Sequence, residues 1–169
     1  MGMGLWQRSL DKEVQMLLKL RQRMAREESG FTLVELLVVM LILGLLAAIA
    51  IPAFFNQRDK AKDSSAKEMA RTSETAMETY ATDHNGVYTG VDAAALRAIE
   101  NSIQTTTSTT DPYLSNAAAV GTKGWTVTVT SGATANTFTI ARDGTTGALS
   151  FTCTTGGTAG CPTGGDWAH

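Results

Sequence analysis

The chain has few of the residues that most often carry chemistry in enzymes. Its 169 residues include two histidines and two cysteines. His84 lies in the sequence DHNG, which is typical of a turn, and His169 is the last residue. Neither adjoins a nucleophile, and the chain contains no P-loop, EF-hand or G-x-S-x-G motif. We therefore predict that the protein is not an enzyme, and we expect no catalytic residues, no metal and no cofactor.

The chain also lacks a strong net charge, which is -2 at neutral pH. No general attraction to nucleic acid is therefore expected. The charges are unevenly distributed, because the residues before Phe31 include six Lys or Arg and four Asp or Glu. That segment is +2 and the remainder is -4. A basic flank before an apolar run fits the positive-inside rule, so we expect the first 30 residues inside the cytoplasm and the rest outside.

The two cysteines, Cys153 and Cys161, lie close together near the end of the chain. In an exported protein such a pair usually forms a disulfide, and two free thiols or half of a metal site are the alternatives. A metal site would need further ligands, and only His169 is near in sequence. Closing so short a loop should stabilise the fold by roughly 2–3 kcal/mol in the chain-entropy model. The surrounding tail is rich in glycine and needs such a bond to hold one shape.

A long apolar run occupies residues 31–50, where Thr32 and Glu35 are the polar exceptions. As a helix it would rise about 30 Å, which matches the thickness of the hydrocarbon core of a membrane. Pro52 follows, and we expect it to kink or interrupt the helix. Before the run, residues 5–28 have apolar side chains at helical spacing among Lys and Arg. They fit a membrane-surface helix or a leader that is later removed.

Three interpretations compete for the apolar run. A secretory signal peptide could be cut at Ala48-Ile49-Ala50, although the run is longer than an ordinary signal core. A signal anchor could hold one external domain on the membrane as a monomer. Neither interpretation explains Glu35, because an ionisable residue inside a membrane segment is costly and usually has a partner.

The third interpretation gives Glu35 a partner. A cut after Gly30 would create an α-amino group on Phe31, about one helical turn from Glu35. The two groups could pair within one helix, or Glu35 of one subunit could meet the Phe31 amine of the next in a staggered bundle. Such a pair would be mostly desolvated, so that losing one partner would be severe. The pair between subunits would also set the axial register of the bundle.

The stretch SGFTLVELLVVMLILGLLAAIAIPAF, residues 29–54, resembles the N-terminal signature of type IV prepilins and pseudopilins. The matching features are Gly30 before the cut, Phe31 as the new N-terminus, Glu35 at the fifth mature position, the apolar stretch and Pro52. The resemblance implies that a prepilin peptidase cleaves between Gly30 and Phe31 and methylates the Phe31 amine. It also implies that an assembly ATPase and a platform protein of the cytoplasmic membrane stack the subunits into a homo-oligomeric helical filament.

The resemblance divides the chain into a leader (1–30), a membrane and filament-core helix (31–52) and an extracytoplasmic globular domain (53–169). A 30-residue leader is long for pilins with this core sequence, where short basic leaders are usual. Met16 and Met24 are therefore alternatives to Met1 as the true start.

After Pro52 the helical pattern resumes and becomes amphipathic. One long helix is expected from about Phe31 to about Thr82, where DHNG ends it. Asp63 and Lys67 are spaced as an i,i+4 ion pair. The predicted buried stripe is Ala66, Met69, Ala70, Ser73, Met77 and Tyr80, and the opposite face is Lys67, Arg71, Glu74 and Glu78.

The remainder predicts a short helix and a sheet. The helix covers 92–103, with Asp92 as its N-cap and with Leu96, Ile99 and Ile103 on one face. Residues 104–111 form a polar loop whose Thr and Ser hydroxyls could carry O-linked sugar. Strands at 123–130, 137–142 and 148–153 alternate apolar and polar residues. The predicted fold class is α+β: a long N-terminal helix packed on a small antiparallel β-meander, with a C-terminal disulfide loop.

These features predict a structural subunit of a type IV pilus-like surface filament, with roles that include adhesion, twitching motility or DNA uptake. Two alternatives remain open. One is a pseudopilin of a type II secretion or competence system, and the other is a monomeric membrane-anchored extracellular binding domain.

Overall fold

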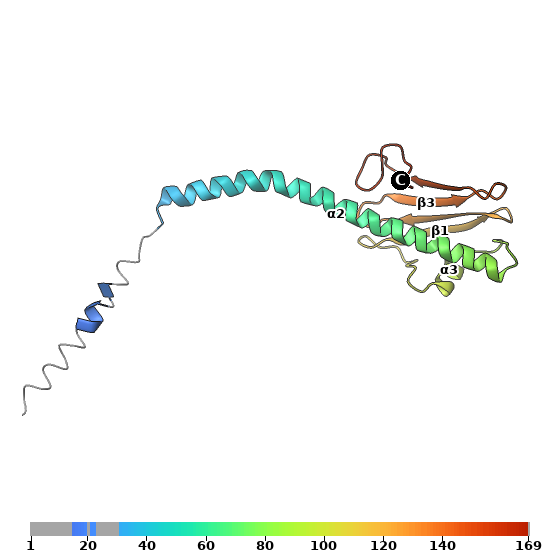
Figure 1. Ribbon diagram of the computed structural model, residues 1–169, viewed down its shortest axis with the longest axis horizontal. Coiled ribbons are helices and arrows are strands. Elements are labelled where there is room, and N and C mark those ends of the chain that lie inside the picture. Colours follow the sequence, from blue (N-terminus) through green and yellow to red (C-terminus); the bar gives the residue numbers. More distant parts are fainter. Residues whose placement is uncertain (1–14, 20, 23–30, 169) are drawn as a thin grey trace, which may run out of the picture. The chain divides into compact units, whose positions relative to one another are not determined.

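The computed structural model describes residues 15–19, 21–22 and 31–168. Its elements in chain order are α2 (Leu33–Asp83), α3 (Ala93–Ile99), β1 (Tyr113–Val120), β2 (Gly124–Thr130), β3 (Thr137–Arg142) and β4 (Leu149–Cys153) (Figure 1). Residues 15–19 and 21–22 are helical, and most of the predicted helix over 5–28 lies outside the described residues. The chain forms two compact units, residues 1–49 and 50–169, and α2 contributes to both.

Helix α2 is continuous over 51 residues, with Pro52 inside it. The predicted single long helix is therefore confirmed, and Pro52 does not interrupt it. Proline removes one backbone donor, but intrahelical hydrogen bonds on both sides of it maintain a helix of this length. The predicted stop is confirmed, since Asn85 and Gly86 adopt positive φ angles of 56° and 77°. The Gly86 N–H donates to the Ala81 carbonyl at 2.7 Å and closes the last turn.

The four strands form one antiparallel sheet in the order β1-β2-β3-β4. Strands β2, β3 and β4 agree with the three predicted strands within a residue at each end. The first strand, β1, was not predicted, because its sequence YLSNAAAV contains small and polar residues of low strand propensity. It is held by its pairing with β2, where Ala117 lies opposite Val127 and Ala119 opposite Trp125.

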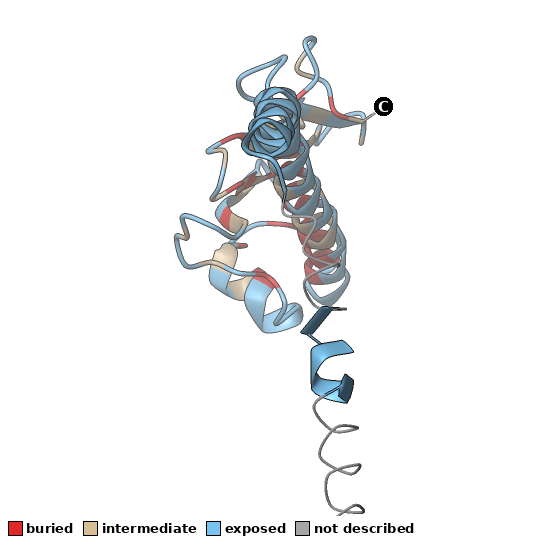
Figure 2. Cartoon of the chain, turned by 90° about the vertical axis from the view of Figure 1, so that its left-hand side faces the viewer, coloured by how far each residue is buried: buried red, intermediate tan, exposed pale blue. Residues whose placement is uncertain are grey.

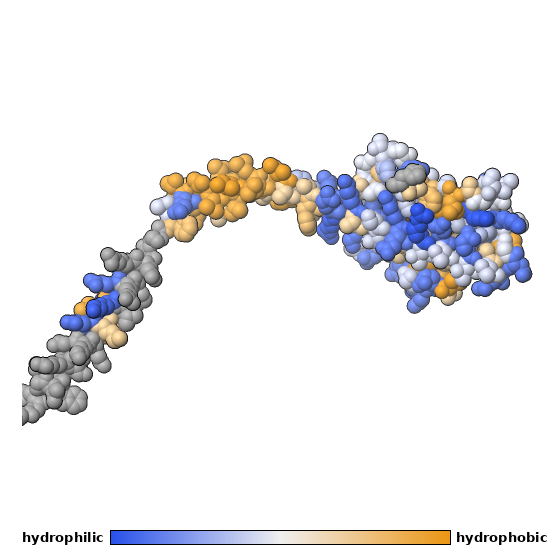
Figure 3. Space-filling view, viewed as in Figure 1, coloured by the Kyte–Doolittle hydropathy of each residue, from blue (hydrophilic) through white to orange (hydrophobic). Residues whose placement is uncertain are grey.

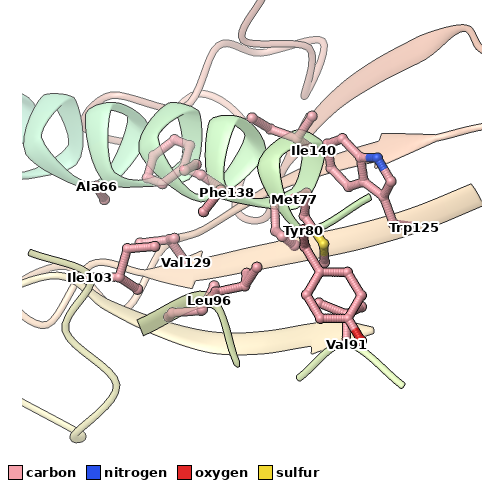
Figure 4. Packing of buried hydrophobic residues seen from close by; sticks show 14 of the residues in the cluster. Ala66, Met77, Tyr80, Val91, Leu96, Ile103, Trp125, Val129, Phe138 and Ile140 are labelled. Carbon is pink, nitrogen blue, oxygen red and sulfur yellow. The ribbon is translucent and has the colours of Figure 1, made fainter. Parts of the chain in front are cut away.

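The core lies between the sheet and the second half of α2, as the predicted fold class requires (Figure 4). The buried residues of α2 form a stripe along one side of the helix, red in Figure 2. Several of them are small, and small side chains let the helix approach the large residues of the sheet. The sheet, α3 and the loop that follows α3 contribute side chains with no exposed surface, namely Trp125, Val127, Val129, Phe138, Ile140, Leu96 and Ile103.

Two details of the predicted packing are wrong. Helix α3 ends at Ile99, and Glu100 is extended because its carboxylate accepts the Ser102 N–H at 3.0 Å and starts a turn. Ile99 is consequently 36% exposed, while Ile103 reaches the core from beyond the helix. At the other edge of the fold, Leu149 begins β4 and is 42% exposed.

Candidate functional site

The start of α2 is built around Thr32. Its side-chain oxygen accepts the Glu35 N–H at 3.2 Å, and its carbonyl accepts the Leu36 N–H at 3.2 Å. Thr32 therefore acts as the N-cap, and Glu35 occupies the third helical position, where a carboxylate interacts favourably with the helix dipole. The T-x-x-E pattern of a capping box was present in the sequence, and the sequence analysis overlooked it. Gly30 lies outside the described residues, and the Phe31 side chain is 74% exposed.

The first half of α2 exposes an apolar surface (orange in Figure 3), with Glu35 in its first turn as the polar exception. By length and composition α2 can cross a membrane, and none of its most apolar window is buried by the rest of the chain. Leaving that much apolar surface in water is strongly unfavourable. Such a helix is suited to lipid or to packing against other apolar helices, because its backbone hydrogen bonds are satisfied internally.

Residues 25–51 match the family model described as the prokaryotic N-terminal methylation motif. The type II secretion system core protein G of Pseudomonas aeruginosa is 41% identical over 59 residues, which are 35% of this chain and 42% of that protein. The type IV major pilin protein PilA of Myxococcus xanthus is 45% identical over 51 residues, 30% of this chain and 23% of the pilin. The N-terminal segment is similar to that of type IV pilins and pseudopilins.

A further relative is the competence protein ComGC of Halalkalibacterium halodurans, 30% identical over 66 residues, which cover 39% of this chain and 65% of that protein. The alignments with the secretion protein and the PilA pilin span less than half of the relatives' length. No solved structure matches the chain significantly. The assignment of the N-terminal segment as pilin-like therefore rests on sequence similarity. The globular part is interpreted from its own contacts.

The globular part of the chain contains the predicted disulfide, Cys153–Cys161, with the two Cα atoms 5.8 Å apart. It joins the end of β4 to a loop that packs on α2. Within residues 15–19, 21–22 and 31–168, no group of three His, Cys, Asp or Glu side chains is arranged to hold a metal ion. His84 stacks on Tyr80, with ring centroids 3.9 Å apart, and its Nδ1 lies 2.8 Å from the Tyr80 carbonyl.

Asp63 does not form the predicted ion pair with Lys67. It is fully buried and accepts hydrogen bonds from the Thr134 hydroxyl, the Asn136 Nδ2 at 2.7 Å and the Gly160 N–H at 2.9 Å. An i,i+4 pair on a solvated helix face is worth a few tenths of a kcal/mol, whereas a carboxylate at a buried position requires donors. The fold therefore supplies these donors from the β2–β3 turn and the disulfide loop.

The helix face opposite the predicted stripe is also not simply solvated. The Arg71 guanidinium lies 4.2 Å from the centroid of the Phe151 ring and 5.3 Å from that of Trp167. The Lys67 ammonium lies 5.4 Å from the Phe138 ring centroid. Cations placed over aromatic faces contribute roughly 0.5–1 kcal/mol at partly exposed sites. The long side chains thus cover the edge of the sheet while their charges stay near water.

Glu78 gathers a second polar cluster near the end of α2. Its carboxylate accepts the Trp125 indole N–H at 3.1 Å and the Tyr88 hydroxyl at 2.7 Å, and Arg142 Nε lies 3.8 Å away. Burial raises the pKa of the Tyr88 hydroxyl, and the hydrogen bond to the Glu78 carboxylate and the charge of that group raise it further. The cluster positions the helix on the sheet and contains no nucleophile.

The remaining turn carboxylates serve local structure. Asp143 Oδ1 accepts the backbone N–H groups of Thr146 at 2.7 Å and Thr145 at 2.8 Å. These two bonds, that of Thr146 first, lower the pKa of Asp143 below its ordinary value. Such contacts are those of an Asx turn.

Proposed function

We propose that the chain is a structural subunit of a type IV pilus-like surface filament, polymerised through the first half of α2. The observation that supports this most is the match to the methylation motif over 25–51 on a helix whose apolar surface is uncovered. A processed, membrane-inserted subunit would exchange lipid for neighbouring helices as it enters a filament. Adhesion, twitching motility and DNA uptake are the roles we propose for that filament.

Processing is proposed between Gly30 and Phe31, by a prepilin peptidase that also methylates the new Phe31 amine. Residues 1–30 would be the removed leader, residues 31–52 the membrane and filament-core segment and 53–169 the extracytoplasmic domain. An assembly ATPase and a platform protein would drive polymerisation from the cytoplasmic membrane. Mass spectrometry of the mature chain tests the first step. The expected N-terminus is Phe31 with one added methyl group, and an intact leader or a start at Ile51 would contradict it.

Glu35 is proposed to pair with the Phe31 amine of a neighbouring subunit and so to set the axial register. Its place in the first turn of α2 also allows a purely local role in helix capping. Two variants separate these roles. Glu35→Gln removes the charge and keeps the side-chain size, whereas Thr32→Ala removes the N-cap, worth about 1 kcal/mol, and keeps the charge.

We expect Glu35→Gln to insert in the membrane and to be cleaved, but to give few filaments by electron microscopy. Thr32→Ala should lose much less assembly, because the desolvated ion pair outweighs the cap. Normal filaments from Glu35→Gln would refute the pairing. Equal losses from both variants would assign Glu35 to helix capping alone.

A pseudopilin is the second candidate, favoured by the 41% identity to a type II secretion core protein G. Both candidates are filament subunits, and both differ from a monomeric anchored binding domain. Cysteine crosslinking between pairs of positions in the apolar half of α2 separates the two classes. Ladders of covalent oligomers in cells are expected of a filament subunit, and uncrosslinked monomer is expected of the anchored domain. Deleting the gene and scoring surface filaments against protein secretion then distinguishes pilin from pseudopilin.

A further inference from the structure

A buried carboxylate connects α2 to the disulfide loop. Asp63 has no exposed surface, and its Oδ2 accepts hydrogen bonds from the Asn136 side-chain amide and the Gly160 N–H. Its Oδ1 accepts the Thr134 hydroxyl. The donors come from two segments that are far from Asp63 in sequence. The carboxylate is satisfied only when the helix, the β2–β3 turn and the disulfide loop come together.

The disulfide loop, residues 153–161, presents its donor through a compact backbone. The Gly157 N–H donates to the Cys161 carbonyl at 2.9 Å, and the Cys161 N–H donates to the Thr158 carbonyl at 2.9 Å. At Gly160 the loop backbone lies directly against the Asp63 side chain, where an added Cβ would lie 2.5 Å from the Asp63 Cβ. Asn136 also reaches the loop, with its Nδ2 3.4 Å from the Thr158 carbonyl. The position of the Gly160 donor thus depends on the fold of a loop closed by one covalent bond.

We propose that Asp63 is a redox-dependent latch, which holds the adjoining turns of α2 on the domain once the Cys153–Cys161 disulfide has formed. With free thiols, the loop is no longer held closed and the Gly160 N–H is not fixed against the helix. A buried carboxylate that loses a donor is strongly disfavoured, so the helix around Asp63 moves its carboxylate toward water. Oxidation therefore completes the docking of the helical segment that follows the apolar run.

The covalent step is an ordinary thiol–disulfide exchange. The Cys153 and Cys161 thiols together lose two protons and two electrons, and one S–S bond forms between them. An external disulfide, of a small molecule or an oxidoreductase, accepts them and is reduced to two thiols as its own S–S bond breaks. This device concerns the folding of the domain and goes beyond assembly, so it can be tested without filaments.

The test measures hydrogen exchange in the full chain in detergent micelles, oxidised or reduced with a phosphine, with the thiol state verified by alkylation. Peptides covering 56–66 report on the latch, and peptides from β2 report on the core. We expect reduction to lower the protection of 56–66 by about tenfold or more, the effect of losing a hydrogen bond to a buried charged group. Protection of β2 should change much less.

Three variants decide whether Asp63 carries the coupling. Asp63→Ala should expose 56–66 already in the oxidised state, and reduction should add little. Asp59→Ala is the matched control, because Asp59 is a carboxylate one turn earlier on the same helix with none of these contacts, and it should behave like the parent chain. Gly160→Ala keeps Asp63 and both cysteines but wedges the loop from the helix, so its oxidised form should resemble the reduced parent.

Two results would overturn the latch. One is a reduced parent chain that keeps full protection at 56–66. The other is an Asp63→Ala chain that loses as much protection on reduction as the parent does, since the loop would then act without Asp63. If Asp63→Ala fails to fold, Gly160→Ala decides alone: full protection of 56–66 in its oxidised form would contradict the proposal.

Discussion

Removing the Glu78 carboxylate should lower the free energy of unfolding of the domain, and the two hydrogen bonds that the carboxylate accepts determine by how much. Glu78→Ala takes the acceptor from the Trp125 indole, whose residue has no exposed surface, and from the Tyr88 hydroxyl, whose residue is 3% exposed. Each buried donor left unpaired costs about 1–3 kcal/mol. The Glu78 side chain is itself 51% exposed, so water can enter the space that truncation leaves and pair at least one donor. We therefore expect a total loss of about 1–3 kcal/mol in the free energy of unfolding, not the sum of two full penalties.

The assay is urea unfolding of the full chain in detergent, followed by tryptophan fluorescence and circular dichroism. Glu78→Gln offers one acceptor oxygen instead of two and should lose roughly half as much stability. Glu68→Ala is the matched control, because Glu68 is an exposed acid on the same helix, and its change should stay within about 0.5 kcal/mol. A Glu78→Ala chain as stable as the Glu68→Ala chain would refute the view that this cluster stabilises the contact between helix and sheet.

Three further results are expected. Met77 has no exposed surface, so Met77→Ala should lower the free energy of unfolding in urea by about 2–5 kcal/mol through lost burial and a residual cavity. A smaller loss than that of Glu68→Ala would contradict the packing in Figure 4. Because the pKa of Tyr88 is raised in the folded chain, its contribution to stability is complete below the ordinary value of 10.0 and is lost as the pH rises through the raised value. The free energy of unfolding should therefore decline as the pH rises across that alkaline range, and it should decline less steeply in Glu78→Gln than in the parent chain. Equal slopes in the two chains would refute the effect of Glu78 on the pKa of Tyr88. Replacing Gly30 by a bulky residue should block or slow removal of the leader, as seen by a retained higher mass on gels, and normal processing would remove the peptidase assignment.

The sequence predicted the parts of the fold that follow from periodicity. Strands β2 and β3 alternate apolar and Thr residues, and a two-residue period with one buried face is a strong signal. The end of α2 was predictable because DHNG supplies residues that tolerate positive φ angles. The close cysteine pair predicted the bond between Cys153 and Cys161. Each of these features depends on residues that are near one another in the chain.

What the sequence did not predict depends on contacts between distant residues. Strand β1 is built of small side chains and is a strand because β2 pairs with it. Asp63 looked like an exposed member of an i,i+4 pair, and nothing local to it predicts Asn136 or Gly160 as donors. Arg71 looked solvated because the aromatic rings beneath it come from residues 151 and 167. Charge on a helix face was thus a poor guide to exposure.

The acids of α2 explain why the helix occupies one position along the sheet. Sliding the helix by one turn, about 5.4 Å, moves each residue to the site of its fourth neighbour. In one direction Lys67 would enter the Asp63 site. Its ammonium group would then face the donor N–H groups of Asn136 and Gly160, an arrangement that is electrostatically unfavourable.

In the opposite direction Asp59 would replace Asp63 and Glu74 would replace Glu78, so these two acceptor sites would not resist the slide. Packing must resist it, because Ser73 would then occupy the fully buried site of Met77, and Ala76 that of Tyr80. Those exchanges would leave cavities between the helix and the sheet. The buried Asp63 site thus prevents displacement one way and large side chains prevent it the other way, which an apolar stripe of alanines could not do in either direction.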